Sequence, residues 1–154
     1  MADQSDLLAA REAADPELWE RLQRMYRESR TIAVVGASHD VTKPSHTIPA
    51  YLQSQGYRII PVNPHGGLLF GERVRSSLAE IDEPIDIVDV FRLPAETPEI
   101  ARQAVAAGAK VLWLQLGIQN EEAREIAEAG GLTVVMNRCL GATHRWLGLG
   151  PGPD

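Results

Sequence analysis

The sequence lacks most of the features that would place it outside the ordinary globular proteins. It has a single cysteine, Cys139, so no internal disulfide can form, which fits a reducing cytoplasm. No apolar run approaches the ~20 residues that a membrane-spanning helix needs. The first residues show no basic segment followed by an apolar one. We therefore expect a cytoplasmic protein without a secretory signal or a membrane partner.

Positive charge is also scarce. Lys and Arg number 15 against 21 Asp and Glu, which gives a net charge of −6. Nucleic acids are bound through clustered Lys and Arg, so this balance excludes a nucleic-acid surface. A small anionic ligand is compatible with it, because such a ligand needs only a local patch and oriented N–H groups. With 154 residues, 44% of them hydrophobic, the chain can form one domain with a substantial core.

Three familiar ligand signatures are missing. Gly36 stands alone after the first predicted strand, whereas the dinucleotide fingerprint has three glycines. The second predicted strand ends in Asn63, where an NAD site usually has an acidic residue for the ribose. No Gly-Lys-Ser/Thr follows the first strand, and no set of His, Cys, Asp and Glu has the spacing of metal ligands. These absences count against NAD(P), a P-loop nucleotide and a metal.

The clearest positive feature is the stretch from Thr31 to Ser38. Residues 32–35 are continuously apolar, which is typical of a strand buried on both faces of a parallel sheet. Gly36 then permits a sharp turn, and Ala37 and Ser38 keep the side chains small where a ligand comes close. A helical pattern follows shortly afterwards. A strand, a tight turn and a helix N-terminus together form an anion site.

Apolar strands alternate with helical patterns along the rest of the chain. Strands are predicted at residues 31–35, 57–62, 85–91, 110–116 and 132–136, and helices at residues 2–29, 44–55, 97–108 and 120–130. This alternation predicts an α/β fold, a single Rossmann-like, doubly wound parallel sheet with helices on both faces. We expect the strand order 3-2-1-4-5, with the ligand crevice between the first and fourth strands. Residues 1–29 are expected to form a helical extension packed on a domain of residues 30–148, with a tail over residues 149–154.

Each predicted strand ends in a small or polar residue. The five residues at these exits are Ser38, Asn63, Arg92, Gln115 and Asn137. Parallel strands place their carboxyl ends on one edge of the sheet, so the exits should gather around one ligand.

The residues at these exits also carry a family resemblance. The motifs are Val34-Val35-Gly36-Ala37-Ser38, Lys43-Pro44-Ser45, Pro61-Val62-Asn63-Pro64, Asp89-Val90-Phe91-Arg92, Trp113-Leu114-Gln115-Leu116-Gly117 and Asn137-Arg138-Cys139. In this order they resemble the small stand-alone CoA-binding protein family, which is similar to the N-terminal CoA-binding domain of the succinyl-CoA synthetase α subunit. The resemblance covers roughly residues 20–145. It departs at Asn137, where many members are expected to have an acidic residue.

The resemblance implies coenzyme A as the ligand and a set of binding residues. These are Gly36, Ala37, Ser38, Lys43, Pro44, Ser45, Asn63, Pro64, Val90, Phe91, Arg92, Gln115, Gly117, Asn137 and Cys139. The N–H groups of Ala37 and Ser38, the Ser38 hydroxyl and the helix start near Ser45 suit the pyrophosphate. Lys43 adds a positive charge for phosphate, and Asn63 can bond to a ribose or a phosphate.

The other half of this set suits the two ends of CoA. Phe91 and Arg92 fit the adenine end by stacking and by charge. Gln115, Gly117 and Asn137 offer polar partners to the amides of the pantetheine arm, within an otherwise apolar groove.

Several of these residues also have simpler interpretations. Lys43 is equally a solvated loop charge, Asn63 before Pro64 is a good turn residue in any protein, and Phe91 is as readily a core residue. Arg92 can instead form an ion pair with Asp89 or Glu96. The side chain of Trp113 is expected in the core.

Cys139 leaves two interpretations open. A lone cysteine is most often a small buried apolar residue. Beside Arg138, and with His144 nearby in the sequence, it can also be a thiolate that forms a mixed disulfide with CoA.

The function predicted from these residues is the binding of CoA or an acyl-CoA by a non-catalytic or regulatory module, with no catalytic residues. Ligase chemistry does not follow from the fold, because it needs a phosphohistidine segment and a nucleotide-grasp partner. Two alternatives stay open: an NAD(P)-binding redox protein, and a subunit that supplies the CoA site of a multi-chain acyl-CoA enzyme. A homo-oligomer and a protein partner are also left open.

Overall fold

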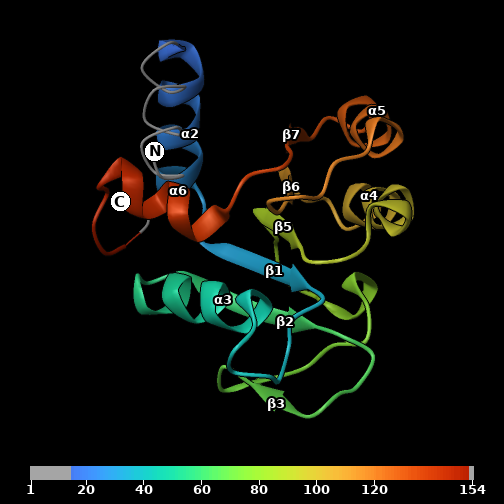
Figure 1. Ribbon diagram of the computed structural model, residues 1–154. Helices are drawn as coiled ribbons and strands as arrows, with labels where there is room; N and C mark the ends of the chain where they lie inside the picture. Colours follow the sequence, from blue (N-terminus) through green and yellow to red (C-terminus); the bar gives the residue numbers. More distant parts are fainter. Residues whose placement is uncertain (1–14, 153–154) are drawn as a thin grey trace.

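The computed structural model describes residues 15–152 and consists of one parallel sheet between two layers of helices (Figure 1). The strands of the sheet are β1 (Thr31–Val35), β2 (Arg58–Val62), β5 (Ile87–Val90), β6 (Val111–Leu114) and β7 (Thr133–Val135). One face carries α2 (Pro16–Glu28), α3 (Pro44–Ser54) and α6 (Leu140–Leu147), and the other carries α4 (Thr97–Ala106) and α5 (Glu121–Ala129). This is the doubly wound α/β fold that the sequence predicts.

The position of the third main strand differs from the expected order. β5 pairs with β1 and β6, so the sheet runs β2-β1-β5-β6-β7, which is 2-1-3-4-5 when its strands are numbered along the chain. The outer edge of β2 is taken by residue Arg75, whose N–H donates to Pro61 (3.0 Å) and whose carbonyl accepts from the Asn63 N–H (3.0 Å). The chain therefore crosses back over β1 before β5 begins. The order of the sheet reverses between β1 and β5, and not between the first and fourth strands.

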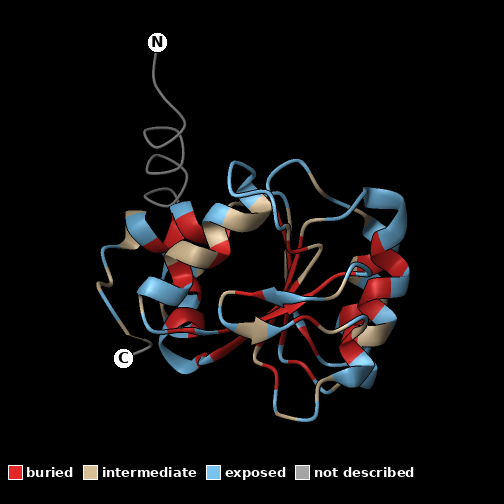
Figure 2. Ribbon diagram, turned by 90° about the horizontal axis from the view of Figure 1, so that it is seen from below, coloured by how far each residue is buried: buried red, intermediate tan, exposed pale blue. Residues whose placement is uncertain are grey.

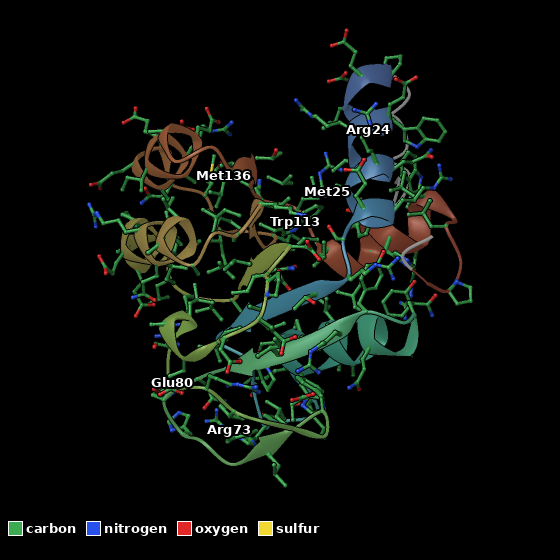
Figure 3. All side chains as sticks on the ribbon, turned by 180° about the vertical axis from the view of Figure 1, so that it is seen from behind. Arg24, Met25, Arg73, Glu80, Trp113 and Met136 are labelled. Carbon is green, nitrogen blue, oxygen red and sulfur yellow. The ribbon has the colours of Figure 1, made fainter. Side chains whose placement is uncertain are left out.

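Short elements make this return. β3 (Leu68–Leu69) and β4 (Glu72–Arg73) form an antiparallel hairpin, followed by the 3₁₀ helix η1 (Leu78–Glu80). Arg73 and Glu80, labelled in Figure 3, approach to 3.8 Å between Nη1 and Oε2. A second 3₁₀ helix, η2 (Pro94–Glu96), leads from β5 into α4.

Hydrophobic side chains cover both faces of the sheet, and Figure 2 shows the buried residues concentrated between the helix layers. On β1, Ile32 and Val34 pack with the core under α2, α3 and α6, and Ala33 packs with the core under α4 and α5. Burial on both sides explains why the strand has no polar alternation. Trp113 is fully buried as expected, in the interior of the fold, and its Nε1 donates to the Arg138 carbonyl (2.7 Å) (Figure 3).

Two helices need separate mention. The start of α2 is as predicted, because the Asp15 carboxylate accepts from the Leu18 N–H (3.0 Å) and Pro16 is the first helical residue. The part of that predicted helix before Asp15 lies outside the described residues. The sequence analysis missed α6, whose cap is the Cys139 sulfur, which accepts from the Ala142 N–H (3.4 Å). In residues 15–152 no helix is long and apolar enough to cross a membrane.

Candidate functional site

Two cavities meet at the carboxyl-terminal edge of the sheet. The first, which we call the polar cavity, has a volume of about 800 Å³ and lies over the ends of β1, β2 and β5 and beside α4. It is lined by Val35, Gly36, Ala37, Ser38, His39, Asp40, Lys43, Ser45, Val62, Asn63, Pro64, His65, Ser76, Phe91, Arg92, Glu96, Glu99, Ile100 and Gln103. It therefore sits at the reversal of strand order, where open α/β sheets bind ligands.

The second, the apolar cavity, has a volume of about 730 Å³ and lies over the ends of β5 and β6. It is lined by Lys43, Pro44, Ser45, Ile48, Phe91, Arg92, Leu93, Pro94, Gln115, Leu116, Gly117, Ile118, Cys139 and Ala142. Four residues line both cavities, namely Lys43, Ser45, Phe91 and Arg92, and we call them the ridge. A single elongated ligand can cross the ridge and occupy both cavities.

The ridge contains the start of α3. Pro44 occupies the first helical position, and within the described residues the N–H groups of Ser45 and Ala37 have no hydrogen-bond acceptor. Free N–H groups at a helix N-terminus favour an anion, and the exposed Lys43 beside them adds a full positive charge. These groups lie where the sequence predicts a pyrophosphate, and their binding of one stays a prediction.

Ser38 contributes differently from the prediction. Its N–H donates to the Ser45 carbonyl (3.2 Å), so this N–H is not free for a phosphate. Its hydroxyl oxygen accepts from the Asp40 N–H (3.0 Å) and retains its own proton to donate. The Ser38 carbonyl lies 2.8 Å from Nδ1 of His46, on α3. Ser38 thus ties the turn to the helix and offers a ligand only its hydroxyl proton.

Asn63 is buried and its side chain is already bonded within the protein. Its Nδ2 donates to the Ala37 carbonyl (3.0 Å), and its Oδ1 accepts from the N–H groups of His65 (2.8 Å) and Gly66 (3.2 Å). The carboxamide therefore clamps the exits of β1 and β2 together. Asn63 also lines the polar cavity, so its direct bond to a ribose or phosphate stays a prediction.

Gly36 allows the closest approach in the site. Its N–H donates to the Val62 carbonyl (2.9 Å), and its φ is +90°. A Cβ at this position would lie 2.5 Å from the Phe91 carbonyl oxygen and 2.9 Å from Cδ of Arg92. Only glycine fits here, because both the backbone angle and the space exclude a side chain.

Arg92 is held in an ion pair with Glu96 and not with Asp89. Its Nε and Nη2 donate to the two carboxylate oxygens of Glu96 (3.0 and 2.9 Å). The hydrogen bonds between the two side chains lower the pKa of Glu96 and raise the pKa of Arg92. The pair is about half exposed, so a ligand phosphate can compete with Glu96 for the guanidinium.

Asp89 is instead completely buried, beneath the apolar cavity. Gln115 Nε2 donates to its Oδ1, and its Oδ2 has no partner among the described residues. Burial raises the pKa of Asp89 to about 7, although the hydrogen bond from Gln115 lowers it. Gln115 also accepts from the Leu140 N–H at the start of α6 (3.4 Å) and lines the cavity. A buried carboxyl thus supports an amide in the wall of the apolar cavity.

Two of the predicted residues lie outside both cavities. Val90 is fully buried in the core, because alternate residues of β5 face opposite sides of the sheet. Asn137 has a φ of +58°, and its Oδ1 accepts from the Gly117 N–H (2.7 Å). It therefore shapes the turn after β6, and its contact with the pantetheine arm stays a prediction.

Cys139 lines the apolar cavity and is partly exposed. His144, which is near Cys139 in the sequence, is buried among three tyrosine rings. Its Nδ1 lies 2.7 Å from the hydroxyl oxygen of Tyr51. Burial lowers the pKa of His144. The sulfur serves as the α6 cap, and the mixed disulfide stays a hypothesis.

The described residues contain no group of three side chains that could hold a metal ion.

The sequence analysis also missed cavity-lining residues that belong to helices and do not follow a strand. The polar cavity takes Glu96, Glu99, Ile100 and Gln103 from the α4 region, and the apolar cavity takes Ile48 from α3 and Ala142 from α6. The helical period of α4 could have identified Glu96, Glu99, Ile100 and Gln103 as one face, since residues three and four apart share a face.

With this geometry in hand, comparison with known proteins identifies the family. A family model described as CoA binding domain matches residues 30–145. The chain belongs to the CoA-binding domain family. It is 43% identical over 128 residues to the Bacillus subtilis protein YneT, which covers 83% of this chain and 92% of that protein.

Members of known structure have the same fold. A Thermus thermophilus protein, cell-free ID.343, shares 40% identity with a TM-score of 0.81, covering 84% of this chain and 98% of its own. A hypothetical protein from Pyrococcus horikoshii OT3 shares 35% identity with a TM-score of 0.81, covering 84% and 91%. The chain is also 30% identical over 84 residues to an ADP-forming acetate–CoA ligase of Archaeoglobus fulgidus, covering 53% of this chain but only 12% of the ligase. The similarity to that enzyme is thus confined to a small part of its length.

Proposed function

We propose that this CoA-binding domain protein binds coenzyme A or an acyl-CoA in the two cavities and acts as a binding module without catalysis of its own. The observation that carries the proposal is the ridge between the cavities. There the free N–H group of Ser45, the Lys43 ammonium and the half-exposed Arg92 line the same cavity as the free N–H group of Ala37, and together they suit a pyrophosphate.

The orientation follows from the two linings. The polar cavity would take the adenosine and its 3′-phosphate, beside His39, His65 and Ser76. The apolar cavity would take the pantetheine arm, whose amides can bond to Gln115. On this proposal Phe91 and Arg92 lie at the middle of the ligand and not only at its adenine end.

Native mass spectrometry of gently purified protein, followed by calorimetric titration, tests the ligand. We expect CoA to be retained, and dephospho-CoA to bind at least about fivefold more weakly, because it lacks the 3′-phosphate and the hydrogen bonds that this phosphate would make in the polar cavity. NAD⁺ should bind more weakly still. Clear binding of NAD⁺ without binding of CoA would contradict the proposal and favour the redox alternative.

Replacing Lys43 by methionine tests the ridge. Loss of its charge should weaken CoA binding about tenfold, or roughly 1.4 kcal/mol, and the deficit should shrink at high salt. Lys110→Met is the matched control, because Lys110 pairs with Asp86 (3.3 Å) and lines neither cavity. An equal loss of CoA affinity in both variants would show that Lys43 has no specific role.

A further inference from the structure

The apolar cavity is nearly as large as the polar one. Its volume of about 730 Å³ nearly equals the 800 Å³ of the polar cavity, which has to receive a whole nucleotide. Pockets of roughly 300–1,000 Å³ hold complete drug-sized ligands. On the proposed function, a pantetheine arm that enters over the ridge would share this cavity with whatever group its thiol carries.

The cavity has an apolar wall. It is built by Ile48 of α3, Ala142 of α6, and Leu93, Leu116 and Ile118 from the segments after β5 and β6. Two of these side chains are strongly exposed to water, Leu93 at 67% and Leu116 at 50%. Large exposed apolar side chains around a cavity mark a surface that gains free energy when an apolar group covers it.

The charges around the cavity decide which acyl groups fit. None of its lining residues is acidic, and its two cations, Lys43 and Arg92, both belong to the ridge. Arg92 is already paired with Glu96. A carboxylate at the far end of an acyl chain would therefore lie against the apolar wall without a partner, which is costly.

We infer that the apolar cavity holds the acyl chain of an acyl-CoA, and that it selects uncharged, apolar chains over dicarboxylic ones. The inference rests on the proposed function, because it needs CoA to cross the ridge with its thiol end in this cavity. It adds the class of thioester that the protein recognises. Leu93 and Leu116 form the exposed part of the wall, which the acyl chain would cover.

Calorimetric titration with CoA, butyryl-CoA, octanoyl-CoA and succinyl-CoA tests the selection. Each buried methylene should increase the affinity about two- to fourfold until the space is filled, so octanoyl-CoA should bind at least tenfold more tightly than CoA. Succinyl-CoA should bind at least tenfold more weakly than butyryl-CoA, which has the same number of acyl carbons. Equal affinity for CoA and every acyl-CoA would overturn the inference and leave CoA binding intact. Absence of binding to all four compounds would overturn the proposed function with it.

A matched pair of variants tests the location. Leu116→Asp puts a charge into the apolar wall and should reduce the preference for octanoyl-CoA over CoA from tenfold or more to below threefold. Leu68→Asp alters an even more exposed leucine, on β3 and outside both cavities, and should keep the full preference. CoA binding measured on the same samples shows that each variant is folded.

Two results would contradict this location. An undiminished octanoyl preference in Leu116→Asp would place the acyl chain elsewhere. Sedimentation velocity measures whether a second copy of the chain, and not an acyl group, covers this wall. If the wild type forms a dimer that Leu116→Asp dissociates, and chain length has no effect on affinity, the wall is an interface between copies and the inference is wrong.

Discussion

Replacing Gly36 by alanine is expected to lower the free energy of unfolding by about 3 kcal/mol or more and to disrupt the ridge. Two effects add. The φ of +90° is strained for any residue with a Cβ, and that Cβ would lie 2.5 Å from the Phe91 carbonyl oxygen. The neighbour is backbone of the segment that follows β5, so it cannot rotate away. Urea denaturation with and without CoA measures both the stability and the damage to the site.

Gly131 provides the control for Gly36. Its φ is +89°, almost the same, but a Cβ there would meet no atom within 4 Å. Gly131→Ala should therefore show the conformational cost alone, about 1–2 kcal/mol, with CoA affinity unchanged. If both variants lose the same stability, the close approach between the β1 turn and Phe91 contributes nothing.

Replacing Asp89 by asparagine is expected to stabilise the protein at pH 8 by up to about 4 kcal/mol. Burial raises the pKa of Asp89 from 3.8 to about 7, so the folded state holds a proton that the unfolded state releases above pH 4. The wild type should lose this stability as the pH rises from about 4 to 7, and it should lose no more from this group above pH 7. Asparagine cannot ionise, and its oxygen can still accept from Gln115. Urea unfolding at several pH values from 4 to 8 measures the difference.

Asp86 provides a control, because its pKa is lowered in the folded protein whereas that of Asp89 is raised. Burial alone would raise the pKa of Asp86, but bonds from the N–H groups of Arg30 and Thr31 and from Lys110 outweigh it and lower that pKa. Asp86→Asn should therefore destabilise the protein at neutral pH, and that loss should vanish on acidification. A stability profile of Asp89→Asn that parallels the wild type between pH 4 and 7 would show that Asp89 does not titrate in this range.

The sequence predicted the strands well, because each combines a continuous apolar run with a small or polar exit. The expected strand order put β5 in the wrong place in the sheet, although Pro61 indicates that β2 is an edge strand. A proline lacks the N–H that an inner strand donates, so Pro61 favours an edge position for β2. β2 is indeed at the edge, with only the Arg75 segment beyond it. The expected order would have put β2 inside the sheet.

The candidate site was predicted in composition more than in geometry. Asn63 and Asn137 follow strands as expected, but their carboxamides bond to backbone groups of neighbouring loops. An amide that holds a loop and an amide that meets a ligand look identical in a sequence, since only the fold decides which way each points. α6 escaped notice because Cys139 is an uncommon cap and Gly141 lies inside the helix.

Because the ridge belongs to both cavities, an acyl-CoA bound as proposed would be a bivalent ligand. Adenosine 3′,5′-bisphosphate and acyl-4′-phosphopantetheine, added as separate fragments, would each bind weakly to their own cavity. Joined through the pyrophosphate, each half raises the effective concentration of the other, so the affinity of the whole exceeds that of either fragment by orders of magnitude. Substitutions in the wall around Leu93, Leu116 and Ala142 can then change the preferred acyl chain while the nucleotide half keeps the ligand bound. On the proposed function, such a division would let acyl selectivity change without rebuilding the turn at Gly36.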